Sequence, residues 1–165
     1  ADAKYDEAVI ETTAALTKLP DDVEILERQA YALERVPVTL RDLDTYLISS
    51  VSYIDSTISN SLIAYNYEVM EYEDIAESSF VAYQIADQFI RFEGTFIVPN
   101  TESGSALSST IKILADNVEV FSEVLQENSA PVDFNIDLTG VEYLRIEKSG
   151  EGIDIISIDN FLTKE

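Results

Sequence analysis

The sequence predicts a mainly β protein, an antiparallel β-sandwich preceded by an N-terminal α-helical hairpin. Two observations carry this prediction. Apolar residues recur at three- and four-residue steps through residues 2–35, which is the period of a helix. After Pro37 the apolar residues alternate with polar ones in short runs between turns, as in half-buried strands. We therefore expect two domains, a helical hairpin at 1–36 and a sandwich at 37–165.

The helical hairpin is predicted by an apolar stripe that runs from Tyr5 to Leu33 and is interrupted once, at "LPDD". Pro20 ends the first helix. We expect Asp21 to cap the second helix, with Glu24 three residues later as in a capping box. Each helix is short and only modestly apolar, so the hairpin needs a partner. The first candidate for that partner is the rest of this chain.

The same segment is similar to part of a tetratricopeptide repeat. Ala8, Ala15 and Pro20 have the spacing of two small residues and a proline in the second helix of such a repeat. The following "DDVEILERQAYALERV" resembles the first helix of the next repeat. The match covers about one repeat's length, and the aromatic and glycine positions of that family are missing. An ordinary amphipathic hairpin is the alternative interpretation.

Strands are predicted through the second half of the chain, where apolar and polar residues alternate between turns. Residues 44–79 are rich in serine and tyrosine, and we expect short strands and long loops there. The predicted strands are 88–100, two strands within 109–125 about a tight turn at Asp116-Asn117, and 152–162.

Residues 130–150 are predicted to form a β-hairpin whose turn is Thr139-Gly140. One strand alternates apolar residues with Asp133, Asn135 and Asp137, and the other follows the turn. Burial of each such apolar side chain contributes about 1.5–3 kcal/mol, so this hairpin belongs to the frame of the fold. The expected core residues are Val132, Phe134, Ile136 and Leu138, with Leu144 and Ile146 beside them on the returning strand.

Charge and composition exclude several classes of function. The chain has 32 acidic and 10 basic residues, a net charge of −22, and this field repels nucleic-acid phosphates and anionic membranes. No apolar run approaches the ~18 residues of a membrane span. We therefore expect no nucleic-acid partner and no membrane insertion. The absence of cysteine and histidine removes thiol nucleophiles, disulfides, Cys/His zinc sites and a Ser-His-Asp triad.

A paired-carboxylate glycosidase is the one enzyme class that this composition leaves open. Its acid and base would have to face each other across a cleft, and the recognisable patterns in this chain are all structural. We therefore expect a protein that is not an enzyme.

From residue 38 onward the chain resembles the β-sandwich family named "novel putative carbohydrate-binding module". The resemblance is carried by "VTLRDLD" (38–44) and "YQIADQFIRFEGTFIVPN" (83–100), and it is best within 109–146. There "IKILADNVEVFSEVL" and "PVDFNIDLTGVEYLRI" follow the strand pattern of the family. The resemblance covers 38–165. It implies a jelly-roll fold, an extracellular or cell-surface location in bacteria, neighbouring domains of a larger protein, and sugar recognition, with Ca²⁺ in some relatives.

Candidate sugar-binding residues lie in "AYNYEVMEYED", the densest group of tyrosines and polar side chains in the chain. Sugars stack their C–H faces on aromatic rings and form hydrogen bonds to carboxylates and amides. A plain strand face is the alternative, because tyrosine is common in strands. Tyr46 and Tyr53 are weaker candidates of the same kind. The candidate carbohydrate-binding residues are Tyr65, Asn66, Tyr67, Tyr72 and Asp74.

Ca²⁺ is the cofactor that the acidic composition suggests, because it prefers oxygen ligands that converge from loops. Asp154 and Asp159 near the C-terminus are the candidate ligands, with Asp42 and Asp44 as a second pair, and no EF-hand spacing is present. The resulting hypothesis is a non-catalytic glycan-binding accessory domain. The alternative is a structural or protein-interaction module.

Overall fold

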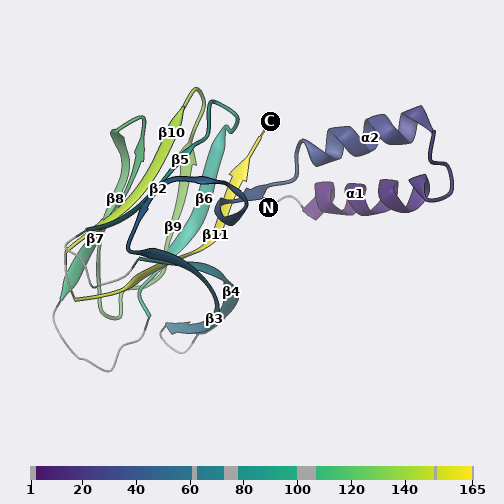
Figure 1. Cartoon of the computed structure of the whole chain (residues 1–165). Coiled ribbons are helices and arrows are strands. Elements are labelled where there is room, and N and C mark those ends of the chain that lie inside the picture. Colours follow the sequence, from purple (N-terminus) through teal and green to yellow (C-terminus); the bar gives the residue numbers. More distant parts are fainter. Residues whose placement is uncertain (1–2, 61–62, 73–77, 100–106, 151, 165) are drawn as a thin grey trace.

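Two antiparallel β-sheets packed face to face form the body of the protein, and a helical hairpin projects from it (Figure 1). The computed structural model describes residues 3–60, 63–72, 78–99, 107–150 and 152–164. The predicted fold class, a mainly β sandwich preceded by a helical hairpin, is confirmed.

The elements follow one another along the chain without long insertions among the described residues. They are α1 (Ala3–Leu16), α2 (Val23–Leu33), β1 (Val38–Thr39), the 3₁₀ turn η1 (Leu40–Asp42), β2 (Thr45–Ser49), β3 (Val51–Asn60), β4 (Ile63–Tyr72), β5 (Ser78–Gln84), β6 (Arg91–Ile97), β7 (Ser108–Ala115), β8 (Val118–Gln126), β9 (Val132–Asp137), β10 (Tyr143–Ser149) and β11 (Ile155–Thr163).

Sheet A has the strand order β3-β4-β11-β6-β9, with the short β1 also paired to β11. Sheet B has the order β2-β5-β10-β7-β8. Neighbouring strands in both sheets run antiparallel. Consecutive strands repeatedly lie in different sheets, so the chain crosses the core several times, as in a jelly roll.

Four phenylalanines join the two sheets. Phe92, Phe96 and Phe134 come from sheet A, and Phe121 comes from β8 of sheet B. The Phe134 ring centroid lies 4.8 Å from that of Phe92, 4.7 Å from Phe96 and 5.9 Å from Phe121. Gly94 lies opposite Phe134 in the β6–β9 register, and the absence of a side chain there leaves room for the Phe134 ring.

The tight turn between β7 and β8 was predicted correctly. Asp116 and Asn117 have φ angles of 49° and 65°, the left-handed conformations that a two-residue hairpin turn requires. The Asp116 carboxylate also accepts hydrogen bonds from the backbone N–H groups of Glu142, at 3.1 Å, and Tyr143, at 2.8 Å. This turn therefore also fixes the entry to β10.

The predicted hairpin at 130–150 is wrong in its pairing. Strand β9 pairs with β6 in sheet A, whereas β10 pairs with β5 and β7 in sheet B. The Thr139-Gly140 turn is a crossing between sheets, held by a 2.8 Å hydrogen bond from the Gly140 N–H to the Asp87 carboxylate. The predicted inward side chains are nevertheless core residues, except that Val132 is only partly buried; they are Phe134, Ile136, Leu138, Leu144 and Ile146.

Residues 44–79 were also predicted wrongly as short strands and long loops. Strands β3 and β4 are each ten residues long and pair along their whole length. Strand β4 pairs with β11 only at Met70–Tyr72, so most of this hairpin extends beyond sheet A as an arm (Figure 1). Polar serines alternate along β3, and this weak pattern concealed a long strand.

The N-terminal helices pack on each other as predicted, with Asp22 instead of Asp21 as the cap of α2. Its carboxylate accepts a 3.2 Å hydrogen bond from the Ile25 N–H. The Gln29 side chain donates a 2.7 Å hydrogen bond to the Thr13 hydroxyl across the pair. The expectation that the hairpin rests on the remainder of the chain is wrong, because α1 and α2 pack chiefly on each other and stand away from both sheets (Figure 1).

Replacing Gly94 with alanine should destabilise the sandwich by about 1–3 kcal/mol, measured by denaturant unfolding. The new Cβ would lie 2.7 Å from Phe134 Cζ and 3.0 Å from the Ile158 carbonyl oxygen. Gly140→Ala is the matched control, since its φ of 76° adds strain of about 1 kcal/mol but no atom lies within 4 Å. A Gly94→Ala loss no larger than that of the control would contradict the close contact.

Removing residues 1–36 should leave the melting temperature of the sandwich within about 2 °C of that of the whole chain. The reason is that the hairpin contributes little to the core. Circular dichroism checks this directly, with loss of helical signal as the internal control. A larger fall in melting temperature would show that the hairpin supports the sheets.

Candidate functional site

A polar depression lies on the outer face of sheet A, where β6, β9 and β11 run side by side. Its volume is about 560 Å³, within the range of small-molecule sites. The residues that line it are Glu93, Gly94, Thr95, Asp133, Phe134, Asn135, Asp159 and Phe161.

The strand register brings the polar residues of the depression together. Glu93 lies opposite Asn135, and Thr95 lies opposite Asp133, in the β6–β9 pair. Alternate residues of a strand point to opposite faces, so these four share the face away from Phe92 and Phe96. The same alternation that buries the phenylalanines therefore builds the polar surface.

A β-bulge in β11 supplies the third side of the depression. The β11–β6 register shifts between Ile158 and Phe161, and Asp159 within the bulge has a φ of 53°. Pairing resumes with Phe161 opposite Glu93. Bulges redirect side chains, and this one places a carboxylate and a half-buried aromatic ring at the same opening.

Hydrogen bonds orient the polar side chains without using all of their capacity. The Thr95 hydroxyl donates to Asp133 Oδ1 at 2.8 Å, and the Asn135 amide donates to Glu93 Oε2 at 3.4 Å. A carboxylate has two oxygens with about four acceptor sites, so Asp133 can accept further hydrogen bonds. Asn135 also keeps a carbonyl oxygen and a second N–H for an added group.

Burial raises the pKa of the Asp159 carboxyl above its ordinary value of 3.8. The bulge takes this carboxyl partly out of water, and burial disfavours the charged form. Among the described residues no three carboxylates converge in a way that could hold a metal ion. The depression thus offers hydrogen-bonding groups and one aromatic ring, which together suit a neutral polyhydroxylated ligand.

A family comparison agrees with this architecture. Residues 75–157, half of the chain, match the NPCBM/NEW2 domain. The chain belongs to the NPCBM/NEW2 domain family. The resemblance drawn from the sequence alone is thereby confirmed. No curated protein sequence matches the chain.

Solved structures similar to this NPCBM/NEW2 chain are carbohydrate-binding modules. CBM51 from Clostridium perfringens GH95, in complex with methyl-galactose, has a TM-score of 0.65 and 18% identity over 78% of this chain and 100% of its own. CBM51-2 with INT domains from Clostridium perfringens ZmpB, in complex with GlcNAc, has a TM-score of 0.65 and 12% identity over 78% and 31%. At these identities the likeness shows the fold alone.

A third similar structure contains the M60 catalytic domain of ZmpB together with CBM51-1 and CBM51-2. Its TM-score is 0.66 at 16% identity, over 78% of this chain and 15% of that structure. This NPCBM/NEW2 chain therefore spans a small part of the larger ZmpB structures.

The sugar-binding residues predicted from the sequence lie on β4 or beside it. Tyr65, Asn66 and Tyr67 occupy the arm, opposite Ile58, Thr57 and Ser56 of β3. Tyr72 lies at the root of the arm, where it pairs with Ile155 of β11, and Asp74 falls outside the described residues. Their side chains are not among those described, so this site stays a prediction.

Tyr46 occupies a bulge of β2, at the point where the β2–β5 register shifts. Its ring contacts Tyr143 of β10, with centroids 5.9 Å apart, on the outer face of sheet B. Both rings are exposed, but the nearby Arg145 is engaged with Glu147 at 2.9 Å and lies over the Phe80 ring. Fewer polar groups are therefore available beside this pair than in the depression. Tyr53, the other weaker candidate, lies on β3 opposite Met70.

The predicted Ca²⁺ ligands do not sit together. Asp154 precedes β11 and Asp159 lies inside it, so their Cα atoms are separated by roughly 15 Å of extended chain. Asp42 instead accepts a 2.7 Å hydrogen bond from the Thr39 hydroxyl, as a cap of η1, and Asp44 lies before β2. The Ca²⁺ hypothesis stays a prediction for Asp154 and Asp159, each of which would need its own further ligands.

Five residues of the depression were not predicted as functional. The local alternation did place Asp133 and Asn135 on the polar face of a strand, which was the available signal. Nothing in the sequence joined them to β6 or β11, because those pairings depend on long-range register. The missed residues are Glu93, Thr95, Asp133, Asn135 and Phe161.

Asp159→Asn should stabilise the protein at neutral pH and not at low pH. Because the folded-state pKa is raised, the stability linked to protonated Asp159 is present below pH 3.8 and lost as the pH rises through the folded pKa. Asparagine cannot ionise and also tolerates positive φ. Thermal melts should show a gain of no more than about 2–4 °C at neutral pH that disappears in acid. A gain equal at both pH values would reflect only the backbone preference of asparagine.

Proposed function

We propose that this chain is a non-catalytic carbohydrate-binding accessory domain of a bacterial exported or cell-surface protein, and that the depression on sheet A holds the glycan. In this proposal residues 37–165 are the binding domain and residues 1–36 a separate appendage. The observation that carries it is the meeting of the Phe161 ring with the orienting polar pairs of β6 and β9, in a chain of the NPCBM/NEW2 family.

The chemistry of the depression matches a sugar more closely than a charged ligand. Phe161 offers an apolar surface for the C–H face of a pyranose ring, and Asp133 and Asn135 offer neighbouring acceptors and donors for hydroxyl groups. The net charge of −22 opposes anionic ligands. The site is open and shallow, so binding of a single sugar would be weak and would gain from repetition in a larger protein.

Location and catalytic role belong to the same proposal. The described helices include none that is long and apolar enough to cross a membrane. The carboxylates of the depression accept hydrogen bonds from neighbouring side chains, with Asp133 oriented by Thr95 and Glu93 by Asn135. A positioning role for these carboxylates supports binding instead of bond cleavage.

Methyl-galactose and GlcNAc are the first ligands to test, because two proteins with the same fold were solved with them. A glycan array should show binding to galactose- or N-acetylhexosamine-type sugars, both with added Ca²⁺ and with a chelator if no ion takes part. Binding only with Ca²⁺ would support the metal hypothesis. Silence across all glycans would contradict the glycan function and favour the structural or interaction module.

Phe161→Ala and Asn135→Ala should each weaken glycan binding about tenfold, measured by titration calorimetry, because each removes a direct contact. Tyr143→Ala is the matched control, since it removes an exposed aromatic ring from sheet B. Tyr67→Ala with Tyr72→Ala tests the β4 site in the same assay. Loss of binding only in that double variant would move the glycan from the depression to the arm.

A further inference from the structure

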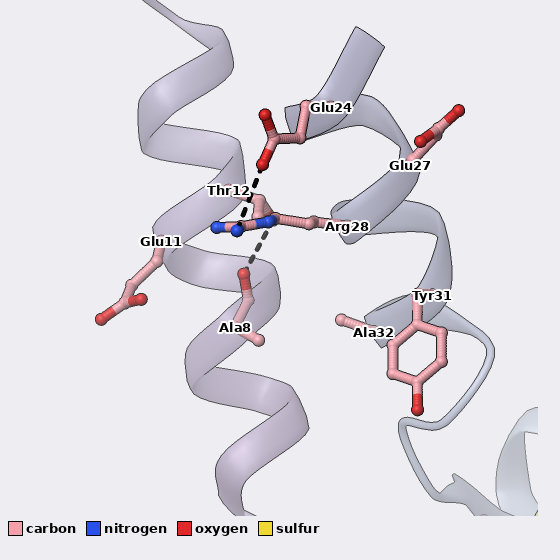
Figure 2. Close-up of a pocket in the computed structure, with 8 residues that line it drawn as sticks. All are labelled: Ala8, Glu11, Thr12, Glu24, Glu27, Arg28, Tyr31 and Ala32. Carbon is pink, nitrogen blue, oxygen red and sulfur yellow. Dashed lines mark hydrogen bonds and ion pairs between the residues drawn. The ribbon is translucent and has the colours of Figure 1, made fainter. Parts of the chain in front are cut away.

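A groove runs between α1 and α2 on one side of the helical hairpin (Figure 2). Its volume is about 440 Å³, and it lies outside the sandwich and outside the glycan site proposed above. Helix α1 contributes Ala8, Glu11 and Thr12, and α2 contributes Glu24, Glu27, Arg28, Tyr31 and Ala32.

Small side chains form the floor of this groove. Ala32 is 2% exposed, and Ala8 faces it across the pair. The Thr12 hydroxyl donates a 2.7 Å hydrogen bond to the Ala8 carbonyl, so it is already engaged within α1. Tyr31, 55% exposed, forms an aromatic wall at one end, with the Arg35 guanidinium 3.7 Å from its ring centroid. An apolar side chain could therefore enter without leaving a buried polar group unpaired.

The rim of the groove carries a surplus of negative charge. Arg28 pairs with Glu24 at 3.3 Å, so the basic side chain of the groove is largely neutralised. Glu11 on α1 and Glu27 on α2 extend from the two walls, and within the described part of the chain neither has an ion partner (Figure 2). Positively charged side chains on a bound segment would find a carboxylate on each side.

The helices themselves leave a hydrophobic requirement unmet. They have 14 and 11 residues, lengths at which helices depend on packing for stability. Their packing on each other buries little apolar surface, since Ala32 is the one described helical residue that is fully buried. The sandwich supplies no further cover, because the hairpin stands away from it. A third helix laid along the groove would meet this requirement.

We propose that the groove between α1 and α2 binds an amphipathic helix whose apolar stripe is flanked by lysine or arginine. The apolar stripe lies over Ala8 and Ala32 and against Tyr31, and the basic flanks pair with Glu11 and Glu27. A second copy of this chain is disfavoured as the occupant, because it brings a further net charge of −22. This proposal is independent of glycan binding.

The test uses the whole chain and a synthetic helical peptide in which leucines form one stripe and lysines flank it. The control peptide has the same composition, scrambled so that leucine and lysine do not segregate on a helix. Fluorescence anisotropy should show the patterned peptide binding at least about tenfold more tightly than the scrambled one. Equal binding of both peptides would overturn the proposal, because only general attraction to an acidic protein would then be present.

Charge reversal locates the binding surface. Glu11→Lys combined with Glu27→Lys should weaken binding of the patterned peptide about tenfold. Glu123→Lys combined with Glu142→Lys changes the net charge equally on exposed sandwich positions and should alter the affinity less than about twofold. Equal losses in the two variants would overturn the proposal.

Two further measurements keep the result interpretable. Circular dichroism verifies that the groove variant keeps its helices, and Glu11→Gln with Glu27→Gln is the milder variant if it does not. Light scattering reports the oligomeric state without peptide. A dimer that the groove variant dissociates would assign the groove to a second copy and overturn the basic-helix proposal.

Discussion

The packing of Phe134 between Phe92 and Phe96, with Phe121 reaching it from the opposite sheet, is the contact on which the sandwich depends. It joins the edge strand of sheet A to the edge strand of sheet B, so it closes the body of the protein on that side. The ring fits because Gly94 has no side chain. The outward residues of the same strands are free of this constraint, and the polar depression is built from them.

Local period was sufficient to predict which side chains face the core but insufficient to predict strand partners. Phe134 and Leu138, or Leu144 and Ile146, follow the alternation of any half-buried strand. Thr139-Gly140 is compatible with a hairpin turn and equally with a crossing between sheets. The choice depends on the Asp87 and Asp116 carboxylates, which bind that segment from 53 and 26 residues away. Such distant contacts leave no periodic trace in the sequence.

The candidate site was harder to predict than the fold. Asp159 was the one residue of the depression proposed from the sequence, and for a different ligand. Asn135 and Glu93 are 42 residues apart and meet only through register. Phe161 faces the depression because a bulge precedes it, and a bulge shifts the alternation by which outward residues are recognised. The segments that identify the family are thus the core strands, whereas ligand contacts lie on faces that those patterns do not constrain.

The pairing of β1 with β11 has a mechanical consequence. Val38 lies opposite Leu162, so the chain enters and leaves the sandwich at the same end of two antiparallel strands. Tension applied to both ends would open this pair as a zipper, one hydrogen bond at a time, instead of shearing its bonds together. Strand β1 has only two residues and would peel away under little load, while β11 stays held between β4 and β6. The protein therefore has a weak first joint that can lengthen under force before its core is disturbed.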